Sequence, residues 1–150
     1  MTEEKSNAAK EVMVRLKTEI TNGDDTENIE LITFGTLHHK SNSTYVRYVE
    51  HMEDTGEVNT TVKYGDDDEM LIIRKGAVRM RQYFKVGMIT EGSYDSIHGK
   101  LQLAIRTRKL NHTVNPDTQE EIFQASYSLY MGKENVGDYL LTLTVKEEKK

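Results

Sequence analysis

Residues 70–84 read MLIIRKGAVRMRQYF and contain the clearest alternation of side-chain type in the chain. After Ala77, the even-numbered residues are apolar or neutral: Val78, Met80, Gln82, Phe84 and Val86. The odd-numbered residues between them are basic or aromatic. Because successive side chains of a strand point to opposite faces, the stretch predicts two antiparallel strands joined by a tight connection near Gly76.

The same alternation recurs along most of the chain, interrupted by glycine, asparagine and aspartate. Asn22-Gly23-Asp24-Asp25 and Asn115-Pro116-Asp117 are typical turn sequences, and Gly35 suggests a bulge or a sharp coil within a long strand. The pattern predicts strands over residues 12–20, 27–39, 44–52, 57–64, 69–74, 78–86, 89–94, 100–111, 121–131 and 138–146. No long helix is expected.

So many short strands in a row predict an all-β fold. A sheet of this size would expose two edges and one apolar face, so we expect it to close into a single antiparallel meander barrel of eight to ten strands. Such a barrel is filled by side chains or holds one small ligand. We expect Leu101, Leu103 and Ile105 to be buried. Several expected inward positions are polar: Thr60, Gln82, Thr107, Gln124 and Ser126.

Length and composition favour one cytoplasmic domain. The 150 residues include no cysteine, and the opening MTEEKSNAAK lacks the apolar core of a signal peptide. No apolar stretch approaches the roughly 20 residues of a membrane helix. We expect a disordered polar tail over residues 1–11, the barrel over residues 12–147 and a charged tail over residues 148–150.

Charge is unevenly distributed, although the net charge is only −5. The balance is −9 over residues 1–70, +7 over residues 71–112 and −3 over residues 113–150. Basic strands in a barrel often only pair with acidic neighbours, so the positive middle has a structural as well as a functional interpretation. Under the functional interpretation, the positive segment forms an outer basic face that comprises Arg79, Arg81, Lys85, Arg106 and Arg108.

No pattern in the sequence indicates a catalytic mechanism. The chain lacks a P-loop, a dinucleotide fingerprint, a nucleophile elbow and a zinc-protease helix, so we expect no cofactor and favour a non-enzymatic role. His38 and His39 are adjacent on a predicted strand and would point to opposite faces, which argues against a shared metal ion. Asp66-Asp67-Asp68-Glu69 lacks the spacing of a calcium loop.

The direction of Arg74 depends on how the hairpin closes. A three-residue loop, Lys75-Gly76-Ala77, would place Arg74 inside with Met70 and Ile72. A two-residue loop, Gly76-Ala77, would instead place Leu71 and Ile73 inside and Arg74 outside. We expect Arg74 inside, where a guanidinium needs either a carboxylate partner or an anionic ligand; the sequence leaves both open.

The hairpin residues 72–84, IIRKGAVRMRQYF, resemble the YwiB-like family of uncharacterised bacterial proteins. Weaker similarity lies in Gly99-Lys100-Leu101-Gln102-Leu103 and in Ala125-Ser126-Tyr127-Ser128-Leu129. The resemblance implies a calycin-type barrel, as in lipocalins, and implies no activity. Analogy with calycins favours a small-ligand cavity, although the polar inward positions differ from the interior of a fatty-acid carrier.

Three hypotheses follow. The first is a barrel that binds a small anionic or amphipathic ligand, with Arg74 and Gln82 as polar anchors and an apolar lining of Met80, Phe84, Leu103 and Tyr127. The second is an interaction module whose outer basic face binds nucleic acid or an acidic protein; the acidity of the whole chain opposes nucleic-acid binding without excluding it. The third is a filled barrel that self-associates through an exposed strand or barrel end, giving a homo-oligomer.

Overall fold

Ten antiparallel strands close into one barrel in the computed structural model, which describes residues 9–52 and 56–148. The strands are β1 (Lys10–Asn22), β2 (Asp25–Lys40), β3 (Ser43–Met52), β4 (Gly56–Gly65), β5 (Glu69–Gly76), β6 (Arg79–Lys85), β7 (Ile89–Ser96), β8 (Gly99–Val114), β9 (Glu121–Met131) and β10 (Glu134–Glu147). Each pairs with its sequence neighbours, and β1 closes the barrel by pairing with β10. The predicted all-β meander barrel is confirmed.

The barrel begins at Lys10, two residues before the predicted boundary at Val12, because Lys10 and Glu11 pair with Leu37 and Thr36 of β2. The remainder of the predicted N-terminal tail, residues 1–8, lies outside the described residues, as do residues 149–150. No helix in the described part of the chain is long and apolar enough to cross a membrane.

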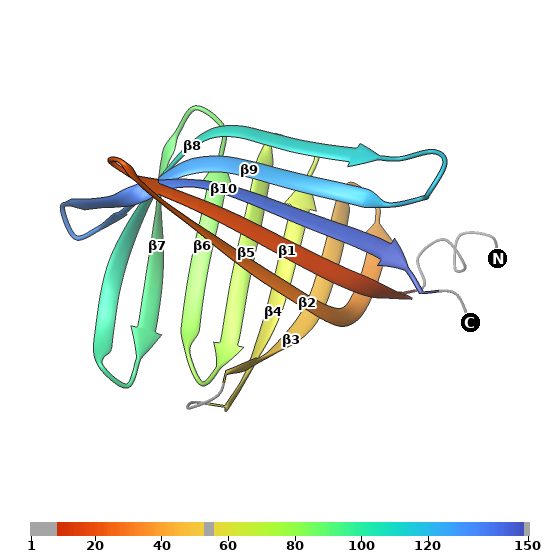
Figure 1. Cartoon of the computed structure of the whole chain (residues 1–150), viewed down its shortest axis with the longest axis horizontal. Coiled ribbons are helices and arrows are strands. Elements are labelled where there is room, and N and C mark those ends of the chain that lie inside the picture. Colours follow the sequence, from red (N-terminus) through yellow and green to blue (C-terminus); the bar gives the residue numbers. More distant parts are fainter. Residues whose placement is uncertain (1–8, 53–55, 149–150) are drawn as a thin grey trace.

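The two halves of the barrel cross each other (Figure 1). The second half of β8 runs together with β9, β10, β1 and β2 along the length of the molecule, whereas β3 to β7 and the first half of β8, which pairs with β7, run across it (Figure 1). The core between the halves comprises the side chains that alternation predicts, including Val14, Val46, Phe84, Ile105 and Leu143, each fully buried. Burial of such side chains contributes most of the stability of a domain of this size.

Two expectations were wrong, one for the inward residues of β9 and one for the burial of Leu101. On β9 the odd-numbered residues Phe123, Ala125 and Tyr127 are buried, so Gln124 and Ser126 point outward. Gln124 Nε2 donates to Thr142 Oγ1 on the outer face of β10, at 3.4 Å. Leu101 is 48% exposed because it lies near the start of β8, where the barrel is open. The other polar positions, Thr60, Gln82 and Thr107, are buried as expected.

Gly35 is not a bulge: β1 and β2 stay in register across it. Pairing of β2 with β3 begins at this glycine, opposite Tyr48. A Cβ atom at position 35 would lie 2.0 Å from the backbone oxygen of Arg47, so glycine is required by close contact between the strands. Register shifts occur instead between Thr107 and Lys109 on β8 and between Asn135 and Gly137 on β10.

Candidate site at the open end of the barrel

Arg74 lies on the inner side of the barrel, as predicted. Cross-strand pairs Met70–Phe84, Ile72–Gln82 and Arg74–Met80 place these residues on one face of the β5–β6 hairpin. The connection differs from both expected loops, because β5 continues to Gly76 by pairing with Val58 of β4. The Ala77 amide then donates to the backbone oxygen of Glu57 at 3.1 Å. The hairpin connection is therefore wider than the expected three-residue loop, but it places the same residues of β5 on the inner side.

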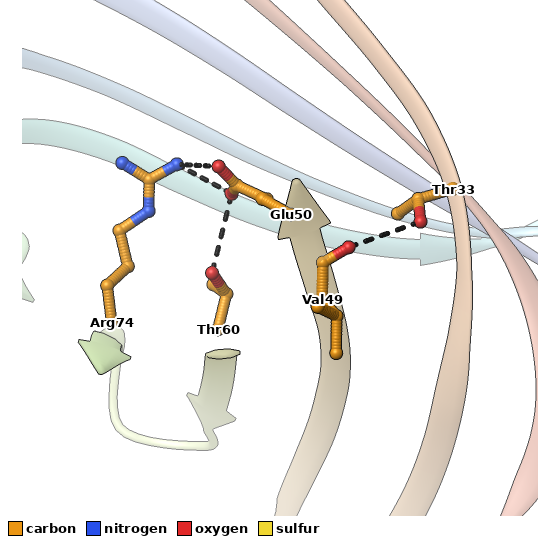
Figure 2. A network of polar contacts seen from close by, with 5 residues as sticks. All are labelled: Thr33, Val49, Glu50, Thr60 and Arg74. Carbon is orange, nitrogen blue, oxygen red and sulfur yellow. Dashed lines mark hydrogen bonds and ion pairs between the residues drawn. The ribbon is translucent and has the colours of Figure 1, made fainter. Parts of the chain in front are cut away.

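The inward guanidinium of Arg74 is paired with a carboxylate. Its Nη2 lies 2.6 Å from both Oε1 and Oε2 of Glu50 on β3 (Figure 2). Thr60 Oγ1 of β4 donates to the same carboxylate at 3.4 Å, so three neighbouring strands contribute to the cluster. The Arg74 side chain is 26% exposed and that of Glu50 12%, which places the pair at the boundary between core and solvent.

A side-chain contact connects β2 to the strand that carries Glu50. Thr33 Oγ1 donates to the backbone oxygen of Val49 at 3.3 Å (Figure 2). This contact lies just beyond the last β2–β3 pair, Gly35–Tyr48. It therefore holds the two strands together where their ladder ends.

The positive charge of Arg74 affects the pKa of two buried tyrosines, Tyr48 and Tyr127. Burial raises the pKa of the Tyr48 hydroxyl, Glu50 adds to this effect, and Arg74 opposes it. Burial likewise raises the pKa of Tyr127, with Tyr139 adding and Arg74 opposing. Both phenols are thus neutral at physiological pH, and both lie within electrostatic reach of the guanidinium.

The six predicted ligand residues all lie on the inner side but at different depths. Gln82, Phe84, Leu103 and Tyr127 are buried in the packed core, and the Phe84 and Tyr127 rings meet edge to face with centroids 4.8 Å apart. Met80 and Arg74 are only partly buried. Tyr127 stacks on the partly exposed Tyr139 at 5.1 Å, which makes an aromatic path from the core toward this end.

Inward-facing residues at this end of the barrel are open to solvent. Ile29 of β2 is 49% exposed although it has the same parity as the buried Leu37. Tyr94 of β7 pairs with Met80 on one side and Leu101 on the other, and it is partly exposed as well. We call this region, around Arg74, Met80, Tyr94 and Tyr139, the open end.

The other end of the barrel contains a buried cluster that the sequence analysis missed. Nε2 of His39 and Nε2 of His112 each lie 2.8 Å from a different oxygen of Glu121, whose side chain is 8% exposed. An ionised carboxylate only accepts hydrogen bonds, so both nitrogens carry protons. The His112 ring also stacks on Phe123 at 4.4 Å.

Electrostatics hold the Glu121 carboxyl in its charged form. Burial acts to raise its pKa, but hydrogen bonds from His112 and His39 lower it further than burial raises it. The net result is a pKa below the ordinary value of 4.5. Among residues 9–52 and 56–148, no group of three or more histidines and acids has the arrangement of a metal site.

The predicted outer basic face is divided in the structure. Arg79 and Arg81 are exposed on β6, but Lys85 donates to the backbone oxygen of Asp67. Strand β7 separates Arg106 from β6. Arg108, at the β8 bulge, donates to Ser128 and lies 3.7 Å from Asp138, so its charge is partly balanced.

A different basic surface spans the outer side of β3 to β6. The guanidinium of Arg47 lies 5.2 Å from the ring centroid of Tyr45, and Lys63 Nζ lies 5.8 Å from the same centroid. A hollow of about 100 Å³ lies beside them, lined by residues that include Lys63, Leu71, Arg81 and Tyr83. Arg81 is opposite Ile73, and Tyr83 is opposite Leu71.

Comparison with known proteins agrees with this architecture. The chain is 30% identical over 133 residues to the "Uncharacterized beta-barrel protein YwiB" of Bacillus subtilis, covering 89% of this chain and 91% of that protein. The crystal structure of the ywiB protein from Bacillus subtilis superimposes with a TM-score of 0.83 at 25% identity, over 99% of this chain and 100% of that one. The model of the family described as "Domain of unknown function (DUF1934)" matches residues 14–143. The chain therefore belongs to this family of YwiB-like β-barrel proteins.

Proposed function

We propose that this cytoplasmic, non-enzymatic protein binds a small amphipathic molecule at the open end of its barrel. The polar or anionic group of the ligand contacts Arg74, and its apolar part lies along Met80, Tyr94 and Tyr139. Gln82, Phe84, Leu103 and Tyr127 form the packed floor beneath it. A calycin-type architecture, which the family resemblance implies, supports the idea by analogy of fold alone.

One observation carries the proposal. Glu50 occupies only Nη2 of Arg74, whereas Nη1 points away from the carboxylate (Figure 2). Among the described residues neither Nη1 nor Nε has a hydrogen-bond partner, and neither is a buried unsatisfied atom. A guanidinium has five N–H donors in a fixed plane, so the free side can bind a second acceptor.

The charges of Arg74 and Glu50 limit which ligands can bind beside them. Glu50 offsets the positive charge of Arg74, and its carboxylate would repel a second strongly charged group nearby. A singly charged carboxylate or sulfonate, or a neutral amide, suits this position better than a phosphate dianion. The half-buried Met80, Tyr94 and Tyr139 suit an aliphatic or aromatic body.

Calorimetric titration with 8-anilinonaphthalene-1-sulfonate, a singly charged aromatic anion, tests the proposal. We expect saturable binding to the native protein and at least about tenfold weaker binding to Arg74→Met/Glu50→Met, which removes both charges together. Arg79→Met, on the outer face of the neighbouring strand, is the matched control and should bind normally. Absence of saturable binding, or equal binding by all three proteins, would refute the proposal.

The outer basic surface supports a second candidate function, binding of single-stranded nucleic acid. Arg47, Lys63 and Arg81 make no ion pair with any described residue. Arg47 and Lys63 lie against the ring of Tyr45, and the hollow is lined by Lys63, Arg81 and Tyr83, together with Glu69, which accepts a hydrogen bond from Tyr83. Basic side chains track a phosphate backbone, and exposed aromatic rings stack on bases. The net charge of −5 opposes this candidate, so it ranks second.

Fluorescence anisotropy with a labelled oligothymidylate tests the second candidate. Binding should weaken steeply as salt rises and should be lost in Lys63→Glu/Arg81→Glu. Arg106→Glu, on β8 beyond β7, should leave it unchanged. Binding that is insensitive to salt, or equal loss in Arg106→Glu, would exclude this surface.

A further inference from the structure

Among the described residues, ten of the sixteen residues of β2 have no partner strand on one side. Strand β1 pairs with β2 from Asp25 to Leu37, but β3 pairs with it only from Gly35 to Lys40. No backbone hydrogen bond outside these two ladders involves residues 25–34 within the described part of the chain. In an antiparallel strand about half of the amides and carbonyls point away from a given neighbour. Residues 25–34, which we call the β2 edge, therefore present a row of unpaired backbone groups.

The outward face of the β2 edge is exposed throughout, the inward face is exposed up to Ile29, and the edge carries large apolar side chains. Ile29, Ile32 and Phe34 are 49%, 56% and 61% exposed. Phe34 lies opposite Met13 of β1, which is 38% exposed and extends the apolar surface. Exposed apolar side chains along an unpaired strand are typical of a pairing site for another strand.

The β2 edge has only part of the usual protection of a free edge. Natural sheets guard their edges with charged side chains, above all lysine, and with proline, bulges or very short strands. Here the charges are three acids, Asp25, Glu27 and Glu30. The β2 edge reads DTENIELITF, which contains neither lysine nor proline, and its pairing with β1 has no register shift. The edge of this barrel is consequently long and regular, and it is available from Asp25 to Ile32, up to the contact between Thr33 and Val49 of β3.

The charges on the β2 edge favour a second copy in antiparallel orientation. Asp25 and Glu27 lie at one end, and Ile32 and Phe34 lie at the other. Antiparallel pairing of two such edges places each acidic end opposite the uncharged end of its partner, so the acids avoid each other. Glu30, near the middle, is already 3.0 Å from Arg15 and 3.8 Å from Lys17 of β1.

We propose that the β2 edge pairs antiparallel with the β2 edge of a second copy of this chain, forming a two-fold symmetric dimer with a continuous intermolecular sheet. Such an interface is isologous, because the same residues contribute from both copies. The sheet β8–β9–β10–β1–β2 of one copy then continues into that of its partner. This inference is independent of the ligand proposed for the open end.

Sedimentation velocity from about 1 to about 200 μM tests the dimer. We expect the wild-type protein to change from monomer to dimer over this range, and Ile32→Lys and Phe34→Lys to weaken association at least about tenfold. Ile97→Lys, at an 84% exposed position between β7 and β8, is the matched control and should dimerise normally. Far-ultraviolet circular dichroism verifies that each variant is folded.

Hydrogen exchange gives a second, independent readout on the wild-type chain. Amides of residues 25–34 should exchange more slowly at the higher concentration, while those of β5 and β6 should not change. A wild-type chain that stays monomeric at about 200 μM would overturn the proposal. So would a dimer that persists in Ile32→Lys and Phe34→Lys, or a dimer without slower exchange in the β2 edge.

Discussion

Arg74 of β5 binds Glu50 of β3 through a single guanidinium nitrogen, with Nη2 lying 2.6 Å from both carboxylate oxygens. The pair crosses β4, whose Thr60 donates to the same carboxylate. It thereby links three strands of the barrel wall at the open end. It also leaves one side of the guanidinium available, on which the proposed ligand binding depends.

Replacing Arg74 alone should lower the free energy of unfolding more than replacing Arg74 and Glu50 together. Arg74→Met leaves the Glu50 carboxylate, 12% exposed, without its partner, and we expect the free energy of unfolding to fall by about 2 to 3 kcal/mol. Arg74→Met/Glu50→Met should recover most of this loss, because apolar side chains then replace both charges. Urea unfolding of the wild type, the single variant and the double variant measures their free energies of unfolding. A double variant no more stable than Arg74→Met would contradict the coupling.

Acid should weaken the barrel through Glu121. Its pKa in the folded chain is lowered below the ordinary value of 4.5, so the stability that it contributes is present above that value and is lost as pH falls through the folded pKa. Wild type and Glu121→Gln should therefore differ most in melting temperature near pH 6 and converge toward pH 3. Thermal melts across this range measure the effect.

The matched control for this prediction is Glu57→Gln. Glu57 lies 3.2 Å from His51, but both side chains are largely exposed, so solvent screens the pair. The melting temperature of Glu57→Gln should follow that of the wild type at every pH. A constant difference between wild type and Glu121→Gln from pH 6 to pH 3 would show that the histidines do not lower the pKa of Glu121.

Thr107 offers a stabilising substitution. Its Oγ1 is the one buried side-chain polar atom without a hydrogen-bond partner among the described residues. Thr107→Val replaces the hydroxyl with a methyl group and should raise the free energy of unfolding by about 1 kcal/mol. Thr90→Val is the control and should lower it by a similar amount, because Thr90 donates to the backbone oxygen of Tyr83. Equal losses in both variants, measured by chemical unfolding, would disprove the assignment.

Gly35 should tolerate no side chain. In Gly35→Ala the new Cβ would lie 2.0 Å from the backbone oxygen of Arg47, which forces β2 and β3 apart, so we expect a loss of about 1 to 3 kcal/mol. Gly65→Ala places its Cβ 3.3 Å from the flexible side chain of Glu69 and should change stability by less than about 0.5 kcal/mol. Urea unfolding of both variants measures the difference. Comparable losses of stability in Gly35→Ala and Gly65→Ala would contradict the close-contact explanation.

Alternation along the chain was sufficient to predict the ten strands and the inward side of β6, whereas the inward side of β5 also depended on how the hairpin closes. It succeeds at residues such as Met80 and Phe84 because a two-residue period determines the face once the strand is in register. It failed at Leu101, since parity says which face a residue occupies and nothing about whether that end of the barrel is closed.

The buried cluster around Glu121 was missed for a different reason. The register shift between Thr107 and Lys109 changes the inward parity of β8, so that Leu110 and His112 point inward where Leu103 and Ile105 predict the opposite phase. No residue type at Arg108 indicates such a bulge. The partnership of Arg74 with Glu50 was equally hidden, because 24 residues separate them and only the register of β3, β4 and β5 brings them together.

The most direct test of ligand binding at the open end follows the Arg74 side chain itself. Its Nε–Hε signal can be observed by nuclear magnetic resonance while 8-anilinonaphthalene-1-sulfonate is added to the native protein. We predict a saturable shift of this signal, together with the amides of Met80, Tyr94 and Tyr139, whereas the side chains of Arg79 and Arg81 remain unchanged. An Arg74 signal that does not move at saturating probe would contradict the account.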